Sequence, residues 1–236
     1  NRFFADQITQ LGGNYQSRYS IDTKSIEINN NNHLNAIVLK QLNDGTFLDL
    51  KLDVNIIGDY NLRFRLDELN RSIPDHIKVN YQRYNEAAHW AFEQEPMVQR
   101  FDYQLNNEEI VLVYGENSEY RASIQLYPLK VTVSLDGIPQ LVLNNKNFLN
   151  LEHYRTKASE DDPDSNDVAP EESRFNAYHD DFTDSKGDTL PLGPESIALD
   201  FTFVNFTHVY GIPEHADSLS LKDTSEGEPY RLFNVD

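Results

Sequence analysis

Cysteine is absent from this chain of 236 residues. Disulfides, thiolate zinc ligands and cysteine nucleophiles are therefore excluded from the segment, and the usual clue to its redox compartment is missing. Long apolar runs are missing too. The mean hydropathy is −0.63, and no stretch approaches the roughly 18 consecutive apolar residues that a spanning helix needs. The sequence therefore predicts no membrane insertion.

Basic residues are scarce, with 20 Lys and Arg against 39 Asp and Glu and a formal net charge of −19. Such a charge repels phosphate backbones and anionic lipid. We therefore expect no nucleic-acid partner and no membrane partner, while neutral and cationic ligands remain open. The first residues, Asn1 to Ala5, have neither an initiator Met nor the order of a signal peptide. They predict a processed or truncated start.

Most of the legible pattern alternates apolar and polar residues, which is typical of half-buried strands. Such alternation covers residues 48–56, 61–67, 120–126, 129–135, 138–143 and 197–203. Gly58-Asp59 and Asp136-Gly137 predict hairpin turns, the second of type I′. The best helical candidate, Asn85 to Phe92, is short for a stable helix. Strand runs with short turns between them predict an all-β fold, an antiparallel β-sandwich.

One segment, Lys157 to Asp188, differs in composition from the rest. It carries three basic residues against eleven acidic ones, a net charge of −8, and few apolar residues. Such a composition buries too little apolar surface to offset the entropy of ordering. We predict a mobile acidic loop inserted into a single domain that covers residues 1–236.

Two patterns bear on metal binding. Residues 162–166 resemble the first half of a calcium-binding helix-loop-helix, but the Gly and Glu that such a loop needs further along are absent. A solvated acidic loop is the favoured reading. His208, Glu214 and His215 form one close group, yet their spacing fits neither a helical zinc motif nor a zinc ribbon. We therefore predict no metal and no cofactor.

Aromatic residues and sequons leave further alternatives open. Trp90 could be a sugar-stacking platform, although a lone Trp in an aromatic-rich β protein is more often part of the core or its cover. Asn70-Arg71-Ser72 and Asn205-Phe206-Thr207 fit the N-glycosylation pattern. Asn70, in a turn expected after Leu69, is the favoured acceptor. Gly-rich phosphate loops, serine nucleophile elbows and kinase patterns are absent. The 39 acidic residues form so many carboxylate pairs by chance that a pair for glycoside hydrolysis cannot be picked out from the sequence.

The C-terminal stretch is more specific. Residues 208–217 (HVYGIPEHAD) and 228–236 (EPYRLFNVD) resemble glycoside hydrolase family 31. Residues 61–69 (NLRFRLDEL) and 191–196 (PLGPES), followed by Leu199-Asp200-Phe201, fit the same family. The resemblance thus spans nearly the whole chain.

This resemblance implies a galactose-mutarotase-like amino-terminal β-sandwich that packs on a (β/α)8 catalytic barrel, expected after residue 236. The family is retaining, with one Asp as nucleophile and another as acid/base, which requires carboxyls roughly 5–5.5 Å apart. Both are expected beyond Asp236, so no catalytic residue is assigned in this chain. The resemblance further implies removal of α-1,3-linked glucose from high-mannose N-glycans of glycoproteins in the endoplasmic reticulum lumen, with a β subunit that retains the enzyme.

The same resemblance implies a substrate site at the end of the chain. Asp236 matches the position at which a sandwich loop lines the sugar pocket, and Asn234 is a weaker neighbour. A carboxylate there can accept hydrogen bonds from sugar hydroxyls. Tyr210, Gly211, Glu214 and His215 are expected to support that contact. The open alternative is that Asp236 is merely the end of a fragment.

Two further expectations complete the interpretation. Asn205 is expected in the strand just before the motif, where a glycan would be awkward, so we predict that it is unmodified. The alternative to an enzyme's amino-terminal part is a free-standing, non-catalytic β-sandwich that binds glycan or protein. An isolated sandwich from an enzyme would expose the apolar face that otherwise meets the barrel.

Overall fold

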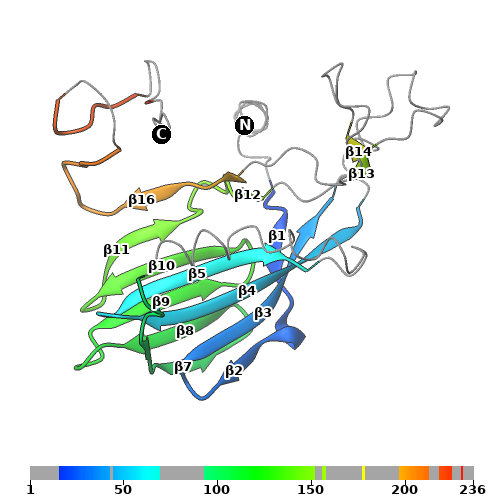
Figure 1. The fold of residues 1–236 in the computed structure, drawn as a ribbon, viewed down its shortest axis with the longest axis horizontal. Helices are drawn as coiled ribbons and strands as arrows, with labels where there is room; N and C mark the ends of the chain where they lie inside the picture. The colour runs from blue at the N-terminus through cyan, green and yellow to red at the C-terminus, as the bar shows by residue number, and fades with distance from the viewer. Residues whose placement is uncertain are drawn as a thin grey trace. The chain divides into compact units, whose positions relative to one another are not determined.

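The computed structural model describes residues 16–42, 45–69, 93–151, 156–157, 177–178, 197–212, 218–224 and 230. The chain divides into two compact units, Asn1–Thr202 and Phe203–Asp236. The described part of the first unit is built mainly from antiparallel sheets (Figure 1). No helix within these described ranges is long and apolar enough to cross a membrane.

Two six-stranded sheets dominate the described residues. The first sheet contains β1 (Tyr19–Ile21), β2 (Glu27–Asn29), β3 (His33–Gln41), β4 (Phe47–Ile57), β5 (Asn61–Glu68) and β6 (Val98–Gln99). The second sheet contains β7 (Asp102–Leu105), β8 (Glu109–Tyr114), β9 (Tyr120–Gln125), β10 (Lys130–Leu135), β11 (Ile138–Leu143) and β16 (Phe201–Phe203). A single-turn 3-10 helix, η2 (Thr23–Ser25), follows β1 and is capped by the Asp22 side chain.

Neighbours in each large sheet are mostly neighbours in sequence. The first sheet has the order β1-β3-β4-β5, with β2 also on β3 and β6 also on β4. The second has the order β16-β11-β10-β9-β8-β7. Two small pairs complete the described part: antiparallel β12 (Asn150–Leu151) with β15 (Ile197–Ala198), and parallel β13 (Thr156–Lys157) with β14 (Ala177–Tyr178).

The core lies between the inner faces of the two large sheets. The apolar residues of β4 that alternate inward are Leu50, Leu52, Val54 and Ile56, and all four are fully buried. Ile110, Leu112 and Ile124 meet them from the second sheet. Removing one such side chain to Ala would cost about 2–5 kcal/mol of stability. The all-β sandwich predicted from alternation is confirmed.

The predicted turns are confirmed by their backbone angles. Asp136 and Gly137 have φ values of +50° and +78°, as a type I′ turn requires at both central positions. The hairpin expected at Gly58-Asp59 joins β4 to β5. The short strands β1, β2, β6, β7, β12, β13 and β14 were not anticipated. Neither were two longer strands, β3 and β8. Their alternation is hidden because β3 carries Ile37 and Leu39 on its outer face, and because β8 buries consecutive residues.

The prediction of one continuous strand over residues 197–203 is wrong in one respect. The structure divides it into β15 and β16, which pair with different partners. The break falls at Asp200, whose carboxylate accepts hydrogen bonds from the backbone N–H groups of Lys146 (2.8 Å) and Phe148 (2.9 Å). Its carbonyl accepts from Asn144 N (2.8 Å). Asp200 is thus bound to the loop after β11 and does not continue a strand.

Asn205 also lies elsewhere than expected. β16 ends at Phe203, and Asn205 occupies an exposed bend with φ +61°. The steric reason for expecting an unmodified Asn205 therefore fails. Other expectations fall on residues outside the described ranges: the helix at 85–92 with Trp90, the residues 162–166, and most of the acidic insertion.

Candidate functional site

The second unit, Phe203–Asp236, contains the described part of the specific C-terminal motif. Residues 208–210 run beside residues 220–221. Leu221 N donates to Val209 O at 2.8 Å, and His208 Nδ1 lies 3.3 Å from Ser220 Oγ. Further along, Lys222 N donates to the Tyr230 hydroxyl at 2.9 Å. These contacts connect segments that are separate in sequence into one small structure.

Tyr210 and Gly211, both predicted as supporting residues, lie directly after Val209 of the first of these segments. Gly211 has φ +119°, a conformation that glycine adopts without strain. The next residue, Ile212, has φ +59°. A β-branched residue in the left-handed region is an outlier, and such strain is concentrated at functional sites. Tyr210 is 58% exposed, with its ring 6.2 Å from that of His208. The segment therefore presents a tyrosine outward from a constrained turn.

The remaining predicted residues of this site lie outside the described ranges. They are Glu214, His215, Asn234 and Asp236, and the same holds for the glycosylation candidate Asn70. The structure therefore places two of the site residues and leaves the role of the whole set as a prediction. Among the described residues, no group of three or more His, Asp or Glu side chains is placed to hold a metal ion.

A cleft of about 370 Å³ opens in the first unit between β5 and β10. Its walls are mostly apolar. They include Phe64, Leu66, Val131, Leu143, Leu149, Leu151 and Leu199. The polar residues along it are Arg63, Arg65, Lys130 and Asn144, and no carboxylate lines it. Because glycoside hydrolysis needs two carboxyl groups, this cleft cannot perform that reaction.

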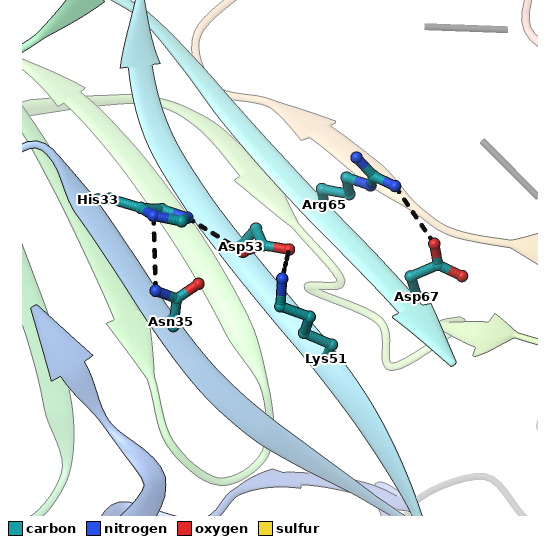
Figure 2. A network of polar contacts seen from close by, with 6 residues as sticks. All are labelled: His33, Asn35, Lys51, Asp53, Arg65 and Asp67. Carbon is teal, nitrogen blue, oxygen red and sulfur yellow. Dashed lines mark hydrogen bonds and ion pairs between the residues drawn. The ribbon is translucent and has the colours of Figure 1, made fainter. Parts of the chain in front are cut away.

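The outer face of the first sheet carries a polar network, drawn in Figure 2. Asp53 lies at its centre, 3.0 Å from His33 Nε2 and 3.0 Å from Lys51 Nζ. Asn35 Nδ2 lies 3.5 Å from the other ring nitrogen of His33. On β5, Arg65 is 3.4 Å from Asp67.

Sequence alternation over residues 48–56 and 61–67 placed Lys51, Asp53, Arg65 and Asp67 on the polar faces of their strands. It did not place His33 and Asn35, which the register of β3 brings to the same group. His33 is opposite Asn55, and Asn35 is opposite Asp53. Each carboxylate of the network is occupied by basic partners, so neither is arranged as a proton donor or nucleophile. The His33–Asp53 contact joins β3 to β4, the Arg65–Asp67 pair lies along β5, and the group carries no evident catalysis.

Comparison with known proteins identifies the class to which this sandwich belongs. The family described as the glycosyl hydrolase 31 N-terminal galactose mutarotase-like domain matches residues 51–236. This match covers most of the chain and extends from within β4 through β16. The chain therefore belongs to this family, as the resemblance implied.

Particular relatives are consistent with that assignment. The chain is 33% identical to glucosidase 2 subunit alpha of Saccharomyces cerevisiae, over 100% of this chain and 28% of the relative. It superposes on a crystal structure of glucosidase II alpha subunit in a Tris-bound form with a TM-score of 0.76 and 29% identity, covering 96% of this chain and 24% of that one.

A third match is a crystal structure of the ER glucosidase II heterodimeric complex, consisting of catalytic subunit and the binding domain of regulatory subunit. Its TM-score is 0.73 with 27% identity, covering 96% of this chain and 24% of that one. The present chain thus spans about a quarter of the length of these relatives.

Proposed function

We propose that this chain is the amino-terminal β-sandwich of an α-glucosidase of the glucosidase II type. The whole protein would remove α-1,3-linked glucose from high-mannose N-glycans of glycoproteins in the endoplasmic reticulum lumen. The observation that carries this proposal is the similarity to the yeast glucosidase 2 alpha subunit across the entire chain. The fold match to glucosidase II alpha subunits supports it independently.

In this proposal the sandwich is a scaffold, and the catalytic nucleophile and acid/base belong to a (β/α)8 barrel that follows residue 236. Two observations support that division. The apolar cleft has no carboxylate along its walls, and the carboxylates of the outer network are held by basic partners. Exposed apolar residues in and near β15 and β16, namely Ile197, Phe201 and Phe203, suit a surface that packs on further structure.

The sandwich would also contribute to the substrate pocket. Asp236 would accept hydrogen bonds from sugar hydroxyls, with Asn234 beside it. Tyr210, Gly211, Glu214 and His215 would hold that loop. The constrained turn at Gly211 and Ile212 supports this assignment, because a strained backbone is retained where a precise position is needed.

A regulatory β subunit is the proposed partner of the whole protein, and no cofactor is required. The heterodimeric complex among the matched structures supports the partner, because the chain of that complex that was matched has the same fold over 96% of the present chain. A retaining hydrolysis needs only two carboxyl groups and water.

The test is hydrolysis of a chromogenic α-glucoside by the full-length protein, comparing wild type with Asp236→Asn. We expect the variant to keep its melting temperature but to lose rate or affinity by roughly tenfold or more, because a hydrogen bond from the sugar hydroxyl to a charged acceptor is lost. The matched control is Asp102→Asn, an exposed carboxylate on edge strand β7. It should retain full activity.

The outcomes separate the two hypotheses. Full activity in Asp236→Asn would reduce Asp236 to a scaffold residue. Absence of α-glucosidase activity in the full-length protein, together with glycan binding, would favour the non-catalytic sandwich.

A further inference from the structure

Three tyrosines gather at one end of the sandwich. The rings of Tyr114 and Tyr120 are stacked, with centroids 5.5 Å apart and planes at 16°. Tyr60 continues the group from the other sheet, with its ring centroid 5.9 Å from that of Tyr120. The turn between β4 and β5 therefore meets the β8–β9 hairpin at this end, which we term the tyrosine end.

The backbone departs from common geometry to bring these rings together. Tyr60 has φ +63°, an uncommon conformation for a large aromatic residue. Gly115 has φ +100°, and a Cβ there would collide with the Glu119 carboxylate and lie 2.9 Å from Tyr120 Cδ2. A residue with a side chain at this position would have to displace the Glu119 carboxylate and adopt a positive φ. Unusual backbone retained at a surface is a ground for inferring function.

Apolar side chains extend the same surface. Leu135 is directly opposite Tyr120 in the β9–β10 ladder, and Ile138 is opposite Leu135 across the next turn. Leu135 is 38% exposed and Ile138 is 56% exposed. Both side chains are far more exposed than the core residues of the sandwich. The three tyrosines therefore continue into an uncovered apolar strip formed by Leu135 and Ile138.

Carboxylates surround this strip. Asp59 and Glu116 are exposed in the two turns. Glu119 is bound through its carbonyl to Asp136 N at 2.8 Å, and its carboxylate accepts from Asn117 N at 2.9 Å. These four acidic residues lie on the three turns that form the end of the sandwich.

The negative charges of three of these carboxylates act on Tyr60. Loss of solvation and then the charges of Glu116, Glu119 and Asp59 raise the pKa of Tyr60. Arg121, the next residue after Tyr120, alternates to the other face of its strand, opposite Val113 and Ser134. Ring faces of tyrosine also attract cations through their quadrupole.

We propose that the tyrosine end is a docking surface for a basic, amphipathic segment of a partner protein. A lysine or arginine of that segment would pack against the rings of Tyr60 and Tyr120, and its apolar neighbours would cover Leu135 and Ile138. Charge complementarity selects this occupant, because aromatic and acidic groups together favour cationic side chains. The inference goes beyond the proposed glucosidase function and does not depend on hydrolysis.

The test uses the full-length protein and a short, fluorescently labelled peptide of alternating arginine and leucine, with binding read by anisotropy. We expect Tyr60→Leu to weaken binding about fivefold, because it keeps an apolar side chain but removes the ring. Tyr60→Phe keeps the ring and should bind within about twofold of wild type.

A second pair of variants tests the charge and leaves the tyrosines intact. Asp59→Asn combined with Glu116→Gln should weaken binding about five- to tenfold. The matched control combines Glu27→Gln with Glu108→Gln, two exposed carboxylates elsewhere on the sandwich, and should bind within about twofold of wild type.

Three results would overturn the proposal. One is equal loss in both charge pairs, which would mean unspecific attraction to an acidic protein. Another is an affinity of Tyr60→Leu for the peptide that equals that of wild type. If Tyr60→Leu does not fold, an unchanged affinity of the Asp59→Asn, Glu116→Gln variant overturns the proposal instead. The third is failure of the wild type to bind the basic peptide, whether or not it binds an uncharged sugar such as methyl α-mannoside.

Discussion

Tyr19 and Lys40 are directly opposite each other in the β1–β3 ladder, and together they bind both backbone polar groups of Leu151. The Tyr19 hydroxyl accepts from Leu151 N at 2.9 Å, and Lys40 Nζ donates to Leu151 O at 2.6 Å. All three residues are buried. This arrangement fixes β12 against the first sheet at the point where the chain leaves for the acidic insertion.

Tyr19→Phe tests that arrangement with a minimal change. The variant keeps the ring but leaves the buried Leu151 N–H without its acceptor, which should cost about 1–3 kcal/mol of local stability. Hydrogen exchange measured on peptides that contain Leu151 should be faster than in wild type. Tyr103→Phe, at an exposed hydroxyl on β7, is the control and should leave that exchange unchanged.

Asp200 gives a second prediction. Its carboxylate holds two backbone N–H groups of the loop after β11, so Asp200→Ala should destabilise that loop by about 1–3 kcal/mol. Asp200→Asn retains one acceptor oxygen and should show a smaller loss. Exchange of the Lys146 and Phe148 amides provides the measurement, and Asp102→Ala provides the control. Equal protection in wild type and Asp200→Ala would contradict the role assigned to the carboxylate.

The stacked tyrosines predict a loss of stability at high pH. Burial first, and Tyr120 second, raise the pKa of Tyr114 to about 12. The unfolded chain releases this proton near pH 10, so the folded state binds more protons between pH 10 and 12 and stability falls over that window. The contribution of Tyr114 to the free energy of unfolding is fully present below pH 10 and amounts to at most about 3 kcal/mol.

Tyr114→Phe should remove that part of the pH dependence. Thermal unfolding measured at intervals from pH 9 to 12 should show a shallower decline in the variant than in wild type. Parallel declines would mean that Tyr114 keeps no such proton in the folded state.

The exposed bend at Asn205 predicts an accessible acceptor site. When the full-length protein is made in a secretory host, Asn205 should carry a glycan, because its side chain is exposed beyond the end of β16. Peptide mapping with Asn205→Gln and Asn70→Gln distinguishes the two sequons. A glycan on Asn70 together with an unmodified Asn205 would contradict this prediction and support the sequence-based one, in which Asn70 is the acceptor.

The strands of the hairpins were predictable because their physics is local. Alternation in residues 48–56 and 61–67, with Gly58-Asp59 between them, specifies both strands and the turn. The strand at 33–41 escaped because Lys40 lies on its inner face, where a charged residue is not expected. Lys40 is tolerated there because the carbonyl of Leu151 accepts its hydrogen bond, 111 residues along the chain.

The candidate site was predictable in identity and less so in geometry. The residues HVYGIPEHAD indicated the family, yet nothing local reveals that Ile212 would follow Gly211 into positive φ. The tyrosine end was not predictable at all. Tyr60 lies in the turn between β4 and β5 of the first sheet and Tyr120 lies on β9 of the second, and only the packing of the two sheets brings their rings together.

By itself, therefore, the sequence determined the fold class, the hairpins, the acidic character and the family, because these depend on periodicity, turn chemistry, composition and a specific motif. The tertiary structure alone decided where Asp200 ends a strand, which carbonyl holds Lys40 and which tyrosines meet. Those outcomes depend on register and on contacts between residues far apart in the chain, which no local pattern encodes.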